Sequence, residues 1–84
     1  MYVQQNGSSI RPDRRGYDVK AGIPISIDLS AWCGGESSHT VQITQDGRVV
    51  HTGCGPWTPA KGGYGLSIRS LLSGQTENFA IIAT

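Results

Sequence analysis

The fold is decided by the stretch His39-Thr-Val-Gln-Ile-Thr-Gln-Asp46-Gly47-Arg-Val-Val-His-Thr-Gly-Cys54. In this stretch, two runs rich in Val, Ile and Thr flank the dipeptide Asp46-Gly47. Because both central residues of a type I′ turn have positive φ, an Asp-Gly pair between such runs is a strong local signal for a hairpin. The stretch therefore predicts two antiparallel strands joined at Asp46 and Gly47.

The position of this turn sets which residues face one another across the hairpin. The expected pairs are Thr44 with Val49, Ile43 with Val50, Val41 with Thr52 and His39 with Cys54. Successive side chains of a strand point to opposite faces. The side chains expected on the core face are therefore those of Val41, Ile43, Val50 and Cys54.

Alternation of apolar and polar residues predicts further strands on both sides of this hairpin. Residues 23–33 alternate over their whole length, which indicates a half-buried strand. Residues 17–21 carry the same phase and precede a turn at Ala21-Gly22. Residues 64–68 begin a last hairpin, and its return strand, residues 77–84, is expected at the centre of a sheet because it is apolar on both phases near its end.

Six or seven antiparallel strands, with turn signals about every 8 to 12 residues, predict an all-β fold. We expect a small β-sandwich or barrel formed by residues 17–84, since 84 residues provide one domain with a small core. Residues 1–16 are polar and contain Gly and Pro. They are predicted to form an extended N-terminal arm, with at most a short edge strand at residues 2–5.

The two cysteines, Cys33 and Cys54, lie on the apolar phases of their strands. Both thiols are expected to point inward, so a disulfide between them is geometrically reasonable. It would close a loop of about 20 residues and add roughly 3 kcal/mol of stability in the chain-entropy model. The alternative is two buried free thiols that act as small apolar side chains. A disulfide would indicate an extracellular, periplasmic or virion setting.

Residues suited to catalysis or metal binding are sparse. The two histidines, His39 and His51, are placed on opposite faces of the hairpin by the expected register, and no Cys-x-x-Cys or His-x-x-x-His spacing occurs. His39 and Cys54 could pair as base and nucleophile, but a thiol in an apolar core has little access to a substrate. We therefore predict no catalytic residue, no metal, no cofactor and no enzymatic activity.

Charge favours a protein as the partner. Seven Lys and Arg against six Asp and Glu give a formal net charge of +1, so there is no global basic field for nucleic acid. The local exception is Arg11, Arg14 and Arg15, which form either a solvated arm or one that docks on an acidic protein surface or on nucleic acid. No signal peptide follows Met1 and no apolar run reaches the ~20 residues of a membrane span, so no membrane partner is expected.

Aromatic residues give a second candidate surface. Trp32 follows the polar phase of its strand beside Cys33, and Trp57 lies in the long loop after Cys54. If the disulfide forms, both rings lie close to it and could join Tyr64 in an exposed patch that binds a partner. The same rings could instead cover an open end of the core.

Three phrases carry a family resemblance: Val19-Lys-Ala-Gly-Ile-Pro-Ile-Ser-Ile27, Val41-Gln-Ile-Thr-Gln-Asp-Gly-Arg-Val-Val50 and Tyr64-Gly-Leu-Ser-Ile68. With them, residues 19–84 resemble a compact immunoglobulin-like β-sandwich. Such modules occur in bacteriophage virions as capsid decoration or cement proteins and as tail additions. The resemblance implies a virion protein that binds capsid subunits and could form homo-oligomers. The chain departs from the immunoglobulin pattern at Thr52, where the tyrosine corner would have Tyr.

A shorter segment of about 22 residues, from Cys33-Gly-Gly-Glu36 to Gly53-Cys54-Gly55, is similar to a disulfide-bearing hairpin of small bacterial envelope lipoprotein domains. It implies a periplasmic or secreted domain that binds or inhibits a ligand through the aromatic patch, although the missing signal peptide counts against it. A third hypothesis is a phage-encoded inhibitor of a host protein. The leading expectation is a non-enzymatic capsid decoration protein whose arm, residues 1–16, lies across neighbouring subunits.

Overall fold

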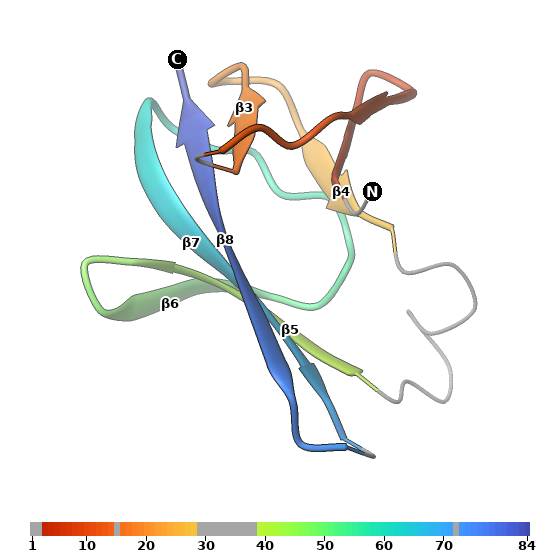
Figure 1. Cartoon of the computed structure of the whole chain (residues 1–84). Coiled ribbons are helices and arrows are strands. Elements are labelled where there is room, and N and C mark those ends of the chain that lie inside the picture. Colours follow the sequence, from red (N-terminus) through yellow and green to blue (C-terminus); the bar gives the residue numbers. More distant parts are fainter. Residues whose placement is uncertain (1–2, 15, 29–38, 72) are drawn as a thin grey trace.

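The computed structural model describes residues 3–14, 16–28, 39–71 and 73–84, and these residues form strands and no helix (Figure 1). The prediction of an all-β chain is confirmed. The strands are β1 (Val3–Gln5), β2 (Ser8–Ile10), β3 (Tyr17–Val19), β4 (Ile25–Ile27), β5 (His39–Gln45), β6 (Arg48–Thr52), β7 (Gly62–Ser70) and β8 (Thr76–Ala83). The described ranges hold no helix with the length and hydropathy that a membrane crossing requires.

The strands form two sheets. One sheet has three strands in the order β2-β1-β4, and the other has five in the order β3-β8-β7-β5-β6. Figure 1 shows the long strands β5, β7 and β8 running through the molecule, with the short strands β3 and β4 near one end. Strand β8 is central, as predicted. One pair, β3 with β8, is parallel, which corrects the expectation of antiparallel strands only; no short hairpin joins these two strands and forces them to be antiparallel.

Both sheets contribute to one apolar core. Its buried members are Val3, Tyr17, Val19, Ile25, Ile27, Val41, Ile43, Tyr64, Leu66, Ile68, Ile81 and Ala83. In β7 the side chains of Tyr64, Leu66 and Ile68 are buried and the residues between them are not, so the alternation expected for residues 64–68 is confirmed. Burial of one Leu or Ile side chain contributes roughly 1.5–3 kcal/mol, and this shared core holds the two sheets together.

The central hairpin has the predicted turn but only part of the predicted register. Asp46 and Gly47 have φ values of 52° and 78°, and Thr44 pairs with Val49 as expected. The pairing then shifts between Ile43 and Thr44, so that Ile43 pairs with His51. A bulge of this kind places one extra residue in one strand.

The extra residue in β6 reverses which of its side chains face the core. Val50, expected on the core face, is 40% exposed, so that prediction is wrong. His51 takes the position opposite the fully buried Ile43. The side-chain pattern of β6 gives no sign of this shift, because Val49 and Val50 are both apolar and either could face inward.

The segment expected to be an extended arm forms paired strands over residues 3–10. Asn6 and Gly7 have positive φ values of 54° and 75°, which is the geometry of a type I′ hairpin turn. This turn joins β1 to β2, and β1 lies between β2 and β4 instead of at an edge. The described residues therefore form eight strands instead of the expected six or seven, and the expected arm is corrected, over residues 3–10, to a part of the folded body.

Gln5 attaches β1 to the chain that precedes β4. Its side chain is 7% exposed. The amide nitrogen Nε2 donates to the carbonyl oxygens of Lys20 and Ile23, at 2.9 and 3.0 Å, and Oε1 accepts from the Lys20 backbone N–H at 3.0 Å. These three bonds satisfy a polar side chain that would otherwise be costly to bury.

Strand β4 confirms part of the strand expected at residues 23–33. Ile25 and Ile27 are buried on either side of the half-buried Ser26. Residues 29–38 lie outside the described residues, so the rest of the expected strand stays a prediction. The Ile25 N–H donates to the carbonyl of Trp57 at 2.8 Å, and the Trp57 N–H donates back to Ile25 at 2.9 Å. These two bonds hold the loop after β6 against β4.

Candidate functional site

The structure separates the residues predicted to bind a partner. Trp57 and Tyr64 meet beside the core, whereas Arg11 and Arg14 lie in the connection between β2 and β3. Arg15, Trp32 and Cys33 lie outside the described residues. The two candidate surfaces, which are separate in the sequence as well, are thus an aromatic group at Trp57 and Tyr64 and a basic turn that carries Arg14.

The aromatic group consists of Trp57, Tyr64 and His51. The rings of Trp57 and Tyr64 meet edge to face, with centroids 4.8 Å apart, and His51 stacks on Trp57 at 6.2 Å. Tyr64 is only 8% exposed and its hydroxyl donates to the carbonyl of Ala60 at 2.9 Å. Tyr64 therefore offers little surface to a partner, and Trp57 packs against the core to which Tyr64 belongs.

Sequence reasoning did not place His51 in this group, because the regular register turned it away from the core. Its Nε2 atom is buried and has no hydrogen-bond partner among the described residues. A buried polar atom without a partner costs about 1–3 kcal/mol. The bulge in the hairpin is what brings this ring inward.

Cys54 is half-buried and packs against the core. Its carbonyl accepts a hydrogen bond from the Ile27 N–H at 3.3 Å, so it lies beside the end of β4. No cysteine in the described part of the chain is free. The disulfide with Cys33 stays a prediction, because Cys33 lies outside the described residues.

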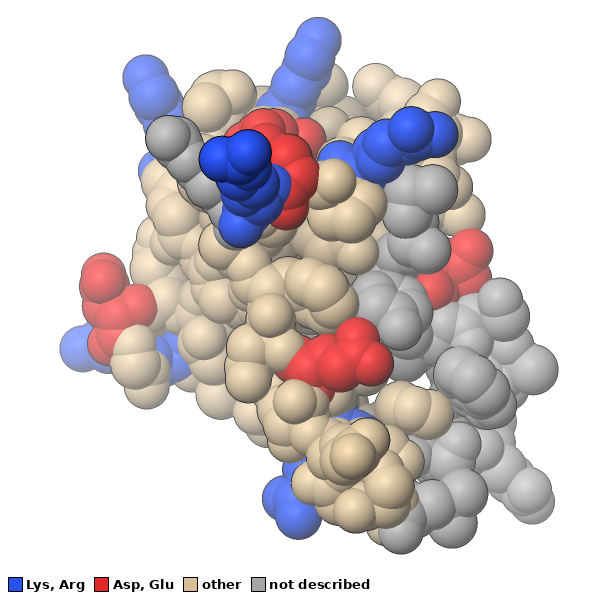
Figure 2. All heavy atoms as spheres, viewed as in Figure 1, with Lys and Arg blue, Asp and Glu red and all other residues tan. Residues whose placement is uncertain are grey.

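The basic turn is held firmly against the five-stranded sheet. Asp13 and Gly16 exchange two backbone hydrogen bonds, of 2.8 and 3.2 Å. Gly16 has a φ of 120°, and a Cβ atom at this position would collide with the backbone of Ala80 in β8. Arg14, between them, is exposed, as is Arg11 just before the turn. Figure 2 shows Lys and Arg side chains standing out from the upper part of the molecule, around the place where Figure 1 shows β3, with Asp and Glu side chains beside them.

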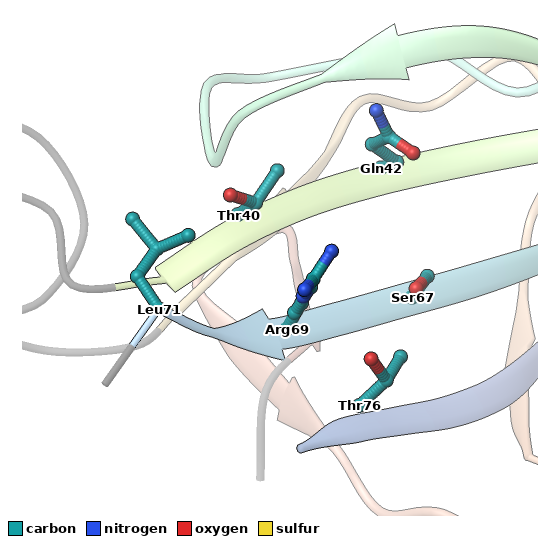
Figure 3. Close-up of a pocket in the computed structure, with 6 residues that line it drawn as sticks. All are labelled: Thr40, Gln42, Ser67, Arg69, Leu71 and Thr76. Atoms are coloured by element: carbon teal, nitrogen blue, oxygen red, sulfur yellow. The ribbon is translucent and has the colours of Figure 1, made fainter. Parts of the chain in front are cut away.

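A polar hollow of about 320 Å³ lies on the five-stranded sheet, on the face turned away from the core (Figure 3). Its lining consists of three hydroxyl groups, one amide, one guanidinium and one apolar side chain, from Thr40, Gln42, Ser67, Thr76, Arg69 and Leu71. Sequence reasoning missed this site. The available signal is the polar phase of the strands, which in a half-buried strand marks the side away from the core.

Among the described strands, β6 is one edge of the five-stranded sheet and pairs with β5 alone. Val49 and Val50 are exposed on it. An edge strand offers unpaired backbone groups to another strand, and exposed valines add apolar contact. This edge is a further surface at which a protein could attach.

Among the residues that the structure describes, no three His, Cys, Asp or Glu side chains gather into a group that could hold a metal ion. The described features are thus an anchored basic turn, a polar hollow and an open sheet edge. No protein-family model, no curated protein and no solved structure matches this chain.

Proposed function

We propose that this chain is a non-enzymatic structural protein that binds protein subunits of a larger assembly, in the manner of a bacteriophage capsid decoration protein. We also propose that its two sheets form an immunoglobulin-like sandwich. The observation that carries the functional proposal is the described part of the basic turn, which presents Arg14 to solvent next to Asp13, and Asp13 is bonded to Gly16 where Gly16 packs on β8.

A fixed turn is well suited to binding. Association has to restrict any backbone that is mobile before binding, and preorganisation reduces this cost. The turn is already restricted by the two backbone bonds between Asp13 and Gly16 and by the close approach of Gly16 to Ala80. Arginine is also enriched at protein interfaces and among the residues that dominate their binding energy.

The partner surface that suits this turn is acidic. The guanidinium group binds carboxylates through two parallel hydrogen bonds, and exposed charges of opposite sign accelerate association. The chain has a formal net charge of only +1, so this preference is local to the turn and does not extend over the molecule.

The proposal is tested on particles purified from the strain that carries the gene. The chain should be present in stoichiometric amounts, as measured by mass spectrometry of the particles. The double variant Arg11→Glu and Arg14→Glu should fold, by circular dichroism, but bind particles at least about tenfold more weakly. Lys61→Glu is the control, because Lys61 is an exposed cation that lies outside both the turn and the β6 edge and should leave binding unchanged. Absence of the chain from particles, or full binding by the double variant, would exclude the proposal.

A second candidate is a periplasmic or secreted domain, and it is favoured by the absence of a free cysteine in the described part of the chain. We propose Cys33, the only other cysteine of the sequence, as the partner of Cys54. The intact mass of protein made in an oxidising compartment should rise by two hydrogen masses on reduction. Reduction should also lower the free energy of unfolding by about 3 kcal/mol. An unchanged mass would exclude the disulfide.

A further inference from the structure

We propose that the hollow around Arg69 binds an acidic side chain, Asp or Glu, from an extended peptide segment of a partner protein. This inference rests on the proposed function in one respect, since it takes the partner to be a protein. It concerns a different surface from the basic turn. The hollow is formed by β5, β7 and β8, and its polar groups come from neighbouring positions on these three strands.

The register places Arg69 between two threonines. Arg69 is directly opposite Thr40 on β5 and directly opposite Thr76 on β8. Directly opposite residues of antiparallel strands have Cβ atoms about 4.5–5.5 Å apart. One row across three strands therefore holds a guanidinium group with a hydroxyl on each side, as Figure 3 shows.

The next row adds two more polar groups on the same face. Gln42 on β5 is opposite Ser67 on β7, and both line the hollow. All five polar groups can donate hydrogen bonds, and Arg69 has no acceptor capacity at all. No carboxylate lines the hollow, and Arg69 forms no ion pair with a described residue.

This donor set suits a carboxylate. The planar guanidinium group of Arg69 can hold both carboxylate oxygens, and this geometry is the one for which arginine is preferred over lysine. The lone pairs that remain on the carboxylate can accept from the hydroxyls of Thr40 and Thr76. A neutral ligand would leave the positive charge of Arg69 unmatched.

The sixth residue of the lining favours a peptide as the source of the carboxylate. Leu71 is 60% exposed and lies at the end of the hollow beside Arg69 (Figure 3). An apolar side chain next to the acidic residue would cover Leu71 and remove apolar surface from water. The described lining includes no aromatic ring on which a sugar ring could stack, so an acidic glycan is the less suitable ligand.

The test is a nuclear magnetic resonance titration of the ¹⁵N-labelled full-length chain. The probe is a capped pentapeptide with a central glutamate between two leucines, and its counterpart has glutamine at the centre. The backbone signals of Thr40, Ser67 and Thr76 should shift with the first peptide. The glutamine peptide should bind about tenfold more weakly, since a charged hydrogen bond is lost.

Three variants assign the binding to the hollow. Arg69→Gln should weaken binding of the glutamate peptide about tenfold, and Arg69→Lys should retain part of it because the charge remains but the two parallel hydrogen bonds do not. The matched control is Arg48→Gln, which removes an exposed arginine at the far end of the same sheet and should change nothing. Peptide shifts that persist in Arg69→Gln, or no shifts with wild type, would overturn the site.

A second probe, polygalacturonate, separates the two sources of carboxylate. If it binds through Arg69 and the peptide does not, the ligand is an acidic glycan and the peptide proposal is wrong. Neither titration uses particles. A failed titration therefore removes the Arg69 site and leaves the proposed function to the particle test with Arg11 and Arg14.

Discussion

Gly16 is the residue at which backbone geometry and packing both exclude a side chain. Its φ of 120° is in the region that L residues rarely adopt, and its missing Cβ is what allows the turn to touch the backbone of Ala80. Because Ala80 belongs to the central strand β8, the neighbour cannot move without disturbing the sheet. The turn that carries Arg14 therefore depends on this one glycine.

Gly16→Ala should lower the free energy of unfolding by at least about 2 kcal/mol, through backbone strain together with the collision. Urea denaturation measures the change. Gly7→Ala is the matched control, because Gly7 also has positive φ but nothing lies within 4 Å of its missing Cβ. Its cost should be about 1 kcal/mol. If the two variants lower the free energy of unfolding equally, Gly16 is not packed against the backbone of β8.

In the central hairpin, β5 with β6, the bulge decides which valine faces water. In the regular register Val50 would be opposite Ile43 and buried, whereas in the structure His51 has that place and Val50 is 40% exposed. The two arrangements differ in the free energy that a polar substitution at Val50 would cost. A stability measurement on two variants can therefore distinguish them.

Val50→Ser should change the free energy of unfolding by less than about 0.5 kcal/mol, as surface substitutions do. Val41→Ser is the comparison on the facing strand, where the side chain is 3% exposed, and it should cost about 2–4 kcal/mol. Chemical denaturation of both variants is the measurement. If Val50→Ser lowers the free energy of unfolding as much as Val41→Ser does, Val50 is buried and the hairpin has the regular register without a bulge.

The two hairpins differ in how well they could be predicted from the sequence. Asp46-Gly47 lies between two runs of β-branched residues, so both turn and strands were predictable. Asn6-Gly7 is an equally good turn signal, yet the strand that follows begins with Ser8 and Ser9, which are exposed, and so gives no apolar alternation. Strand β2 forms because it pairs with β1. The residues of β2 alone give no pattern from which this pairing could be predicted.

The candidate site was less predictable than the strands. Arg11 and Arg14 were identified as an unusual local charge, and the structure places both on the surface. The hollow at Arg69 requires three strands in one register, because its polar groups come from β5 (Thr40 and Gln42), β7 (Ser67 and Arg69) and β8 (Thr76). Spacing along the chain could not bring its lining together.

In the molecule as a whole, the first and the last described strands, β1 and β8, both lie inside their sheets and not at an edge. Strand β1 separates β2 from β4, and β8 separates β3 from β7. Val3 in β1 is fully buried in the core that both sheets share. An 84-residue chain has few other buried side chains with which to replace such contacts. The N-terminal strands should therefore be required for folding, which separates this architecture from a body with a detachable arm.

Deletion of residues 1–10 should consequently unfold the chain, rather than leave a folded domain that cannot bind. It removes Val3 from the core, takes β1 from beside β4, and leaves the backbone groups of Lys20 and Ile23 without the side chain of Gln5. Lost burial and unpaired groups together amount to several kcal/mol, on the order of the whole stability of a small domain. A heteronuclear NMR spectrum of the truncated chain should show poorly dispersed signals.

The double variant Arg11→Glu and Arg14→Glu should keep its dispersed spectrum, because both side chains are exposed. A dispersed spectrum from the truncated chain would mean that β4 and β5–β8 fold without β1, and that residues 3–10 are an arm after all.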